Sequence, residues 1–376
     1  MERTYKIRED LSLAHNGRTL YRIEALVDIP EHCVSKGDIG GYIESYDNLQ
    51  DSAWIFDNAK VYDDAKVFGN AQVFGNSSVY GDAKVFGSAQ VFGNSSVYGD
   101  AEVCGYAEVY ENAKVYDSAV VRDHAKVHGD AAVVCDLAKV YDNAGVYGNA
   151  KVYGKAEVHG YARVYDNAEV WGEAKVYGES VVCGKSTVCD DAEVYDKAKI
   201  YGSAVLGDNA KIYEKAVVCG RAEVYGNAEV YGDSRVLGEA KIYGDAKVYG
   251  NAEVYGKSQV YGYSEVYGYA EVYGYAKVFE GSRIYGSADV YGNAEVRGEA
   301  RITQDHYDYI IFKNWWSSGR SFTWTRSNNM WSVGCFYGTG DELIEKAYQD
   351  SKVSGDNYKA IVDYVNNVVI PQGGKI

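Results

Sequence analysis

The sequence predicts a mainly β chain built as a solenoid of short strands, and two observations lead to this prediction. A small residue, Ala or Ser, recurs at every sixth position from Ala53 to Ala131 and again from Ala138 to Ala300. The residue two places after it is always Val, Ile or Leu. Because residues two apart point to the same side of an extended strand, each six-residue repeat presents two apolar side chains to one interior.

We number the positions of a repeat as slots one to six, starting from the small residue. Slots two and four point outward and carry mostly Lys, Glu and Tyr, whereas slots five and six are rich in Gly, Asp and Asn. Gly, Asp and Asn are typical of sharp turns because they tolerate a positive φ. Each repeat is therefore expected to form one short strand and one corner. A helix is excluded, since a period of six spreads apolar residues all around a 3.6-residue turn.

The repeat is interrupted once, between Ala131 and Ala138. We assign the extra residue to Leu137, after which the six-residue period resumes. A single extra residue leaves no room for a loop that projects from the coils, so the repeat region offers no arm on which an active site could be carried.

The two flanks differ from the repeat and are predicted to cover its ends. Residues 1–40 hold two strand candidates around the turn "HNGR", and the C-terminal flank holds strand candidates followed by two helix candidates. An uncovered solenoid end exposes apolar residues and unpaired strand edges. We therefore divide the chain into an N-terminal β cap at residues 1–40, a repeat region at residues 41–303 and a C-terminal α+β domain at residues 304–376.

The unit "VYGNAK" resembles the hexapeptide repeat of left-handed parallel β-helices, and the segment "AVLGDNAKI" at residues 204–212 comes nearest to the usual form. Most repeats differ from that form by carrying Tyr where the family has Gly. The resemblance implies left-handed coils of roughly 18 residues with three strands each, hence about 14 coils in this chain. The flanking segments "NGRTLYRIEAL", "KGDIGGYIES" and "VGCFYGTGDELIEK" are similar to a group of hexapeptide-repeat proteins of bacteria and phages that is often labelled as transferases.

The charge balance argues against nucleic acid and anionic membranes as partners. The chain has 38 Lys and Arg against 54 Asp and Glu, a formal net charge of −16, which favours a basic protein as partner. The sequence has no apolar run long enough for a transmembrane helix, no apolar secretion signal at its N-terminus, and 7 Cys without C-x-x-C spacing. We expect a cytoplasmic protein, of a bacterium or of a phage-infected host, without a cofactor or a metal.

Corners fall into three columns when three repeats make one coil, and one column is rich in acids. The acids would place a line of negative charge along one edge of the solenoid, which we call the acidic edge. Solubility is one explanation for this charge, and recognition of a basic protein is the other. The predicted binding residues of the acidic edge are Asp63, Asp64, Asp82, Asp100, Asp117, Asp136, Glu173, Asp190, Asp191 and Asp208.

Aromatic residues form a second candidate surface. Slot four carries Tyr in most repeats, and rings stacked on successive coils would stabilise the solenoid. Slot six has no such need, yet Tyr263, Tyr269 and Tyr275 occupy it in three successive repeats. We call these three residues the aromatic collar, and we expect it to contact a partner or a second copy of the chain.

These observations predict a non-enzymatic binding or scaffold protein that acts through the acidic edge and the aromatic collar. The alternative is an acyltransferase of the hexapeptide-repeat superfamily, with acetyl-CoA as cofactor and a site between subunits. The resemblance implies that such an enzyme uses a His on a projecting loop, which this repeat lacks. His124 and His128, which adjoin one corner, are the candidates for its catalytic base.

Overall fold

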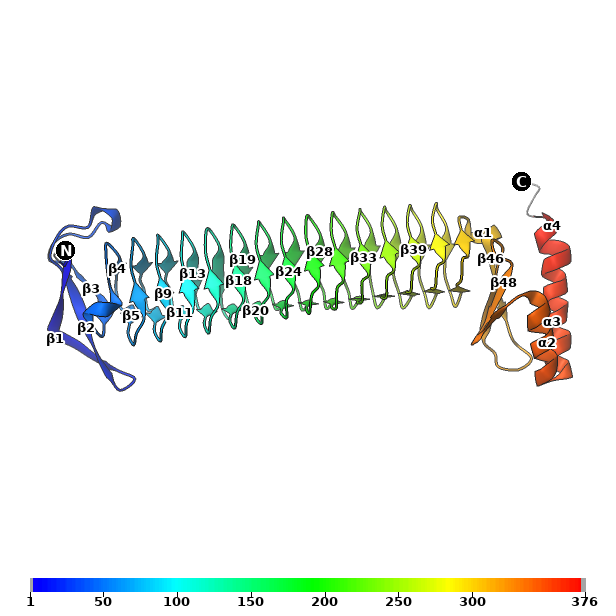
Figure 1. Cartoon of the computed structure of the whole chain (residues 1–376), viewed down its shortest axis with the longest axis horizontal. Coiled ribbons are helices and arrows are strands. Elements are labelled where there is room, and N and C mark those ends of the chain that lie inside the picture. Colours follow the sequence, from blue (N-terminus) through cyan, green and yellow to red (C-terminus); the bar gives the residue numbers. More distant parts are fainter. Residues whose placement is uncertain (1–2, 373–376) are drawn as a thin grey trace. The chain divides into compact units, whose positions relative to one another are not determined.

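The computed structural model describes residues 3–372 and has a mainly β fold with a parallel β-solenoid of about 14 turns. The solenoid expected from the six-residue period is therefore confirmed. The chain divides into two compact units, Met1–Ser203 and Ala204–Ile376. Figure 1 labels the elements along the chain.

Three long strands begin the first unit: β1 (Tyr5–His15), β2 (Arg18–Ala25) and β3 (Ile39–Ile43). β1 and β2 form an antiparallel hairpin, and β2 also pairs antiparallel with β3. β3 then pairs in parallel with β5 (Lys60–Val61), so it joins the hairpin to the repeat strands. The two 3-10 helices of this region are η1 (Pro30–His32) and η2 (Tyr46–Asn48).

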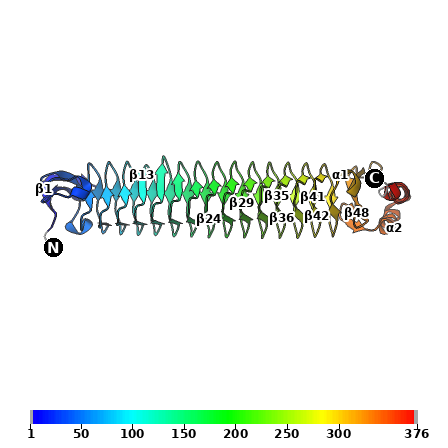
Figure 2. The same cartoon turned by 90° about the horizontal axis from the view of Figure 1, so that it is seen from above.

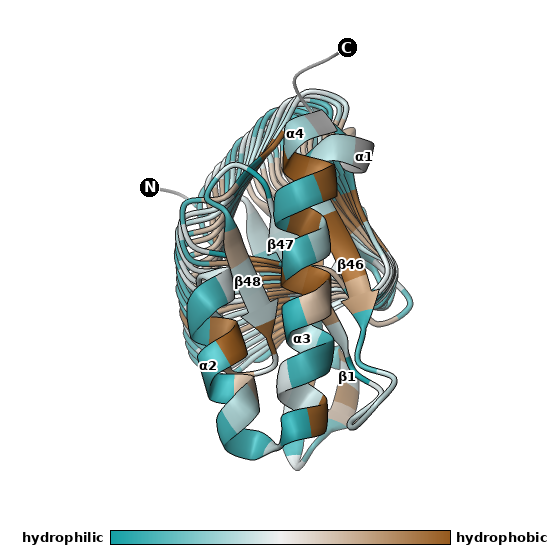
Figure 3. Cartoon of the chain, turned by 90° about the vertical axis from the view of Figure 1, so that its right-hand side faces the viewer, coloured by the Kyte–Doolittle hydropathy of each residue, from teal (hydrophilic) through white to brown (hydrophobic). Residues whose placement is uncertain are grey.

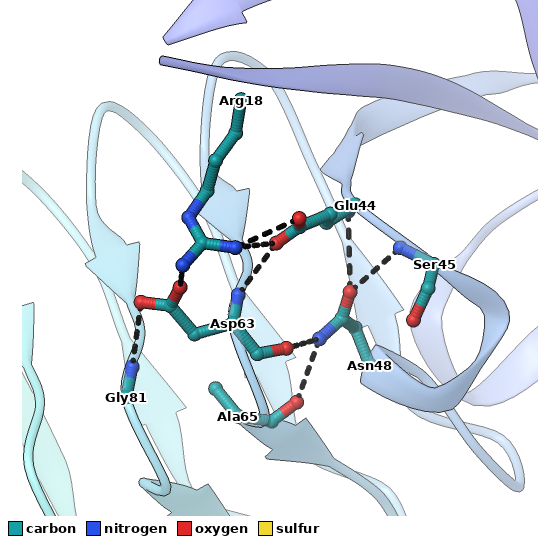
Figure 4. Close-up of polar contacts among 7 residues, drawn as sticks. All are labelled: Arg18, Glu44, Ser45, Asn48, Asp63, Ala65 and Gly81. Atoms are coloured by element: carbon teal, nitrogen blue, oxygen red, sulfur yellow. Dashed lines mark hydrogen bonds and ion pairs between the residues drawn. The ribbon is translucent and has the colours of Figure 1, made fainter. Parts of the chain in front are cut away.

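Asn48, at the end of η2, fastens the connection after β3 to the coils. Its side chain is buried, and its Oδ1 accepts hydrogen bonds from the backbone N–H groups of Glu44 and Ser45, at 3.1 and 2.8 Å. Its Nδ2 donates to the backbone oxygens of Asp63 and Ala65, each at 2.9 Å (Figure 4). All the bonds of this amide are thus satisfied without water.

Arg18, at the start of β2, adds charge pairing to the same junction. Its guanidinium forms ion pairs with Glu44, at 2.9 Å, and with Asp63 (Figure 4). Glu44 also accepts a hydrogen bond from the backbone N–H of Asp63, at 2.8 Å. The hairpin is therefore held to the first coils by side chains as well as by strand pairing.

Each repeat of the first unit forms one strand that includes slots two and three, and Figure 2 shows these strands side by side. Strands three repeats apart pair in parallel and in register, so each coil has three faces. The first face holds β4 (Trp54–Ile55), β7 (Gln72–Val73), β10 (Gln90–Val91), β13 (Glu108–Glu111), β16 (Lys126–Gly129), β19 (Gly145–Tyr147), β22 (Arg163–Val164), β25 (Val181–Val182) and β28 (Lys199–Ile200). The second face holds β5, β8 (Ser78–Val79), β11 (Ser96–Val97), β14 (Lys114–Val115), β17 (Val133–Val134), β20 (Lys151–Val152), β23 (Glu169–Val170) and β26 (Thr187–Val188). The third face holds β6 (Lys66–Val67), β9 (Lys84–Val85), β12 (Glu102–Val103), β15 (Val120–Val121), β18 (Lys139–Val140), β21 (Glu157–Val158), β24 (Lys175–Val176) and β27 (Glu193–Val194).

The extra residue lies in the corner at residues 129–131, so its assignment to Leu137 is wrong. Ala132 and Val134 are fully buried and occupy slots one and three, whereas Ala131 is exposed. Leu137 is 53% exposed and occupies an ordinary slot six. The sequence permits both assignments, because either register places a small and an aliphatic residue inside.

The conformation of Gly129 explains which of the two registers the chain adopts. Gly129 adopts a φ of 122°, outside the range that the other corner glycines share, and a Cβ at this residue would lie 2.3 Å from the backbone nitrogen of Gly148. A corner that is both wider and this close to its neighbour accepts only glycine. The extra residue therefore lies in the corner that contains Gly129, where the backbone can adopt this conformation.

Outward aromatic side chains stack along the coils, as the sequence predicts for slot four. The rings of Tyr80 and Tyr98 lie 4.8 Å apart with planes 3° apart, and Phe74 and Phe92 stack at 4.7 Å. This spacing repeats the distance between adjacent strands, so neighbouring rings cover one another along a face.

The second unit continues the repeat and then changes to a small antiparallel sheet with helices. One face holds β29 (Val205–Leu206), β32 (Glu223–Val224), β35 (Lys241–Ile242), β38 (Gln259–Val260), β41 (Lys277–Val278) and β44 (Glu295–Val296). Another face holds β30 (Lys211–Ile212), β33 (Glu229–Val230), β36 (Lys247–Val248), β39 (Glu265–Val266), β42 (Arg283–Ile284) and β45 (Arg301–Ile302). The remaining face holds β31 (Val217–Val218), β34 (Arg235–Val236), β37 (Glu253–Val254), β40 (Glu271–Val272) and β43 (Asp289–Val290). The sheet is β46 (Tyr309–Lys313), β47 (Ser321–Thr325), β48 (Met330–Val333) and β49 (Phe336–Gly338). The helices are α1 (Asp305–Asp308), α2 (Gly340–Asp350), α3 (Lys352–Tyr364), the π-helix η3 (Val365–Val369) and α4 (Ile370–Gln372).

The sheet and helices at the end of the second unit enclose a core of their own. Trp324 and Trp331 from the sheet are buried against Leu343 of α2 and against Tyr358 and Val362 of α3. On the side that Figure 3 shows, apolar and polar residues alternate along α2 and α3, and the buried residues are spaced four apart, Leu343 and Ala347 on α2 and Tyr358 and Val362 on α3. Each helix therefore buries one stripe, which is the pattern of a helix packed on a sheet.

Candidate binding surfaces

The acidic edge contains two kinds of residue with different surroundings. The slot-five acids adopt left-handed backbone, with φ of 58° at Asp63, 55° at Asp117, 58° at Asp136 and 57° at Asp190, and in the second unit 52° at Asp208. Asp tolerates this conformation better than most residues because its short carboxylate bonds locally. These five residues therefore stand where other repeats use Gly.

Slot-five carboxylates also bind the backbone of the next coil. In each case Oδ2 accepts a hydrogen bond from the slot-five N–H one coil further on. The pairs are Asp63 with Gly81 at 3.2 Å, Asp136 with Gly154 at 2.9 Å, and Asp208 with Gly226 at 2.9 Å. The slot-five acids of the acidic edge therefore stabilise the corners and connect the coils. Their presence does not require an explanation by solubility or by recognition of a partner.

Within residues 3–372, the slot-six acids Asp64, Asp82 and Asp100 form no such bond to the backbone of the next coil. Asp64, Asp82 and Asp100 are exposed, lie on successive coils and line a groove of about 530 Å³. Of the two lysines in this groove, Lys84 is ion-paired at 2.8 Å with Glu102 outside it. Carboxylates stacked at about 4.8 Å produce a strong local negative potential. We call this the acidic groove, defined by Asp47, Asp63, Asp64, Asp82 and Asp100.

Further along the first unit the acidic edge is partly neutralised. Glu173 forms an ion pair with Lys155 at 2.7 Å, and the hydrogen bond from Lys155 lowers the pKa of Glu173 below its usual value. Asp191, in slot six of the next coil, is exposed, and Asp190 accepts a hydrogen bond from the thiol of Cys189 at 3.3 Å. The ion pair thus neutralises Glu173, whereas the hydrogen bond to Asp190 leaves the negative charge of that carboxylate in place.

Three residues of the described chain, residues 3–372, lie close enough to share a metal ion. Asp117, Cys135 and Asp136 each present a ligand atom within 4.8 Å of the other two. Burial raises the pKa of the Cys135 thiol, which favours the protonated form over the thiolate that binds metals. Asp136 already accepts the hydrogen bond from Gly154. The expectation of no metal remains a prediction.

The aromatic collar is strongly exposed, with Tyr263, Tyr269 and Tyr275 at 74%, 69% and 60%. Each of the three precedes a strand of a different face, so they lie at three different corners of one coil. A single flat surface cannot contact all three at once. A partner that uses the whole collar would have to surround the coil.

His124 and His128 are both members of aromatic stacks. The ring of His128 lies between Tyr110, at 4.4 Å, and Tyr147, at 5.2 Å, and its Nδ1 is 3.5 Å from a carboxylate oxygen of Glu111. This sandwich fixes the imidazole plane but leaves its edge toward solvent.

His124 stacks on Tyr106 at 5.0 Å. Its sequence neighbour Asp123, a carboxylate that could orient a catalytic base, is ion-paired with Arg122 at 3.1 Å. Asp123 also accepts a hydrogen bond from the backbone of Asp142, at 3.4 Å. The His124 imidazole therefore lacks that carboxylate as its positioning partner.

Both histidines line a groove of about 770 Å³ that the sequence analysis missed. Gly145 lies at its floor, between Lys126 and Arg163 on the adjacent strands. Gly145 is the one glycine in slot two from Trp54 to Arg301, and this missing side chain was the sequence feature that could have predicted the groove. We call this cavity the Gly145 groove.

No protein-family model matches the chain, and no curated protein matches it. The observations define the class of protein: a parallel β-solenoid of short repeats with stacked tyrosine ladders. Across residues 3–372, none of the helices combines the length and the apolar character that a membrane crossing requires.

Proposed function

We propose that the chain is a non-enzymatic binding or scaffold protein that recognises a basic protein through the acidic groove. The observation that supports this proposal is the alignment of Asp64, Asp82 and Asp100 on successive coils, in a groove where acids outnumber lysines. The backbone ladder fixes the spacing of these carboxylates before any partner arrives. Preorganised charge of one sign steers and orients a partner of the opposite sign.

The partner and its setting follow from the same charge and from the resemblance of the flanks. A protein that normally binds nucleic acid carries the dense positive surface that matches the groove. The similarity of the flanks to hexapeptide-repeat proteins of bacteria and phages supports a phage-encoded protein acting on a host protein in the cytoplasm. The aromatic collar would serve self-association into a homo-oligomer or a second contact with the partner.

An oligo-arginine peptide measures the electrostatic part of this proposal. Replacing Asp64, Asp82 and Asp100 together by Asn should weaken binding about tenfold, because exposed ion pairs contribute about 0.5 kcal/mol each. Calorimetry at low and at physiological ionic strength should show the affinity and its salt dependence falling together.

The control removes the same charge elsewhere, with Asp130, Asp233 and Asp350 replaced by Asn, all three exposed and outside the groove. Equal weakening in the two triple variants would contradict a specific acidic groove. Capture from the native host with the wild-type chain, compared with the groove variant, then identifies the partner.

One observation favours the alternative, an acyltransferase of the hexapeptide-repeat superfamily: His124 and His128 border the Gly145 groove. Acetyl-CoA bound at 100 times its dissociation constant would stabilise the chain by about 2.7 kcal/mol. A thermal shift of that size, lost in His124→Ala or His128→Ala and not reproduced by AMP, would replace the binding proposal by the enzymatic one.

A further inference from the structure

One corner column of the first unit carries an interrupted stack of aromatic rings. Successive coils place Tyr106, His124, Asn143 and Tyr161 in slot six of this column, and backbone hydrogen bonds connect each coil to the next. The rings of Tyr106 and His124 are stacked with planes 4° apart. Asn143 puts a short carboxamide where the next ring would lie, and Tyr161 resumes the column one coil later.

The empty position has the dimensions of one aromatic ring. Stacked rings of this unit repeat at the coil spacing, for example 4.8 Å between Tyr98 and Tyr116. His124 and Tyr161 are two coils apart, which leaves roughly 10 Å between their rings. His124 is exposed and Tyr161 is 64% exposed, so the two rings that border the gap are open to a ligand.

The neighbouring strand is also hollowed at this level. Gly145 contributes no side chain between Lys126 and Arg163, its register partners. Lys126 is neutralised by Glu108 at 3.0 Å, whereas Arg163 has no ion pair within residues 3–372. Burial raises the pKa of Tyr147, and the charge of Arg163 acts against this rise. Positive charge therefore lies beside the gap.

The remaining ionisable groups of the groove do not cancel that charge. Glu179 is ion-paired with Lys197 at 3.6 Å, and the imidazole of His128 faces Glu111. The cavity volume of about 770 Å³ falls within the range of sites for small ligands.

We propose that the Gly145 groove binds a small molecule made of a planar aromatic ring with an anionic substituent. The ring completes the stack between His124 and Tyr161, Asn143 offers a donor and an acceptor to the ring edge, and Arg163 receives the anion. Aryl carboxylic acids and nucleotides share this chemistry. The site is separate from the acidic groove and does not depend on the scaffold role.

Four probes separate the ring from the charge. AMP and 2-naphthoate carry both, adenosine carries the ring alone, and cyclohexanecarboxylate carries the anion alone. By calorimetry on the full chain, AMP should bind about tenfold more tightly than adenosine, and cyclohexanecarboxylate should not bind. Arg163→Gln should remove the advantage of AMP and leave the affinity for adenosine unchanged.

Asn143→Tyr tests the empty position directly, since it supplies the missing ring. The same slot and column accept Tyr at two other coils, so this variant should fold and should lose at least about tenfold in affinity for both aryl anions. Ser88→Tyr is the matched control, because it adds a ring to the same column beside Tyr106 and leaves the gap open. Circular dichroism verifies that both variants are folded.

Binding of AMP alone identifies a nucleotide ligand, binding of 2-naphthoate alone an aryl acid, and either result upholds the site. Absence of saturable binding for both anions overturns the proposal. So does equal binding of cyclohexanecarboxylate, which would reduce the site to a surface charge. Equal losses in Asn143→Tyr and Ser88→Tyr would show that ligands stack on exposed rings in general.

Discussion

The carboxylate of Asp136 accepts a hydrogen bond from the backbone N–H of Gly154, 2.9 Å away on the next coil, while Asp136 itself adopts a φ of 58°. One residue thus forms a left-handed corner and connects two coils. Ala at this position would lose the bond and strain the corner, whereas Gly would lose only the bond.

We therefore expect Asp136→Ala to lower the free energy of unfolding by about 2 kcal/mol and Asp136→Gly by about half as much. Urea denaturation of the full chain measures both. The control is Asp82→Ala in slot six, which should change stability by less than about 0.5 kcal/mol. Identical midpoints for the Ala and Gly variants of Asp136 would contradict the role of its backbone conformation.

The register around the extra residue predicts opposite fates for two adjacent alanines. Ala132 is fully buried and Ala131 is exposed. Ala132→Asp should cost about 3 kcal/mol or more, because it buries a charge without a partner, and Ala131→Asp should be nearly neutral. Thermal unfolding of the two variants distinguishes the registers, since an extra residue at Leu137 would reverse the order.

The hydrogen bonds of Asn48 predict that replacing it destabilises the structure around β3 and not the fold as a whole. Asn48→Ala removes four hydrogen bonds and leaves buried backbone groups unpaired, which should lower the free energy of opening around β3 by about 2–4 kcal/mol. Hydrogen exchange at β3 measures this change. Gln50→Ala, an exposed neighbour, is the control and should leave exchange at β3 as in the wild type.

Tyrosines of the ladders predict a loss of stability at high pH. Burial, with the negative charge of Glu157 adding to it, raises the pKa of Tyr141 to about 12, and Tyr153 beside Glu169 is raised to about 12 as well. The folded chain keeps these hydroxyls protonated where the unfolded chain ionises them, near pH 10. Their contribution is complete below pH 10 and falls as the pH rises toward 12.

Melting temperatures between pH 9 and pH 12 should therefore decline, and tyrosinate absorbance should follow with a delayed titration. Tyr141→Phe should reduce the decline, because it removes one such hydroxyl while keeping the ring in its stack. A decline of unchanged steepness in this variant would assign the alkaline loss to other groups.

The buried positions could be predicted because slots one and three are restricted to a few residue types over the whole repeat. The fold class follows from that restriction and from strand geometry alone. The position of the extra residue could not be predicted, because Ala131 and Ala132 suit the interior equally well and the choice rests on how Gly129 contacts Gly148.

The two roles of the acidic edge were hidden for a different reason. The partner of Asp136 is a backbone N–H one coil away, and the sequence does not show which backbone groups a carboxylate will bind. The gap at Asn143 was hidden because it is an absence, visible only when the column is assembled and Tyr106, His124 and Tyr161 are seen to belong together.

The near-identity of the coils has a consequence for how the chain finds its fold. A strand that pairs with the wrong coil keeps almost every contact of the correct pairing, so misaligned intermediates would be nearly as stable as the native state. Only the departures from the repeat penalise such errors. The widened corner at Gly129 and the ion pair of Arg18 with Asp63 can each form in only one alignment of the coils. These two features therefore favour the native pairing over pairings shifted by one or more coils.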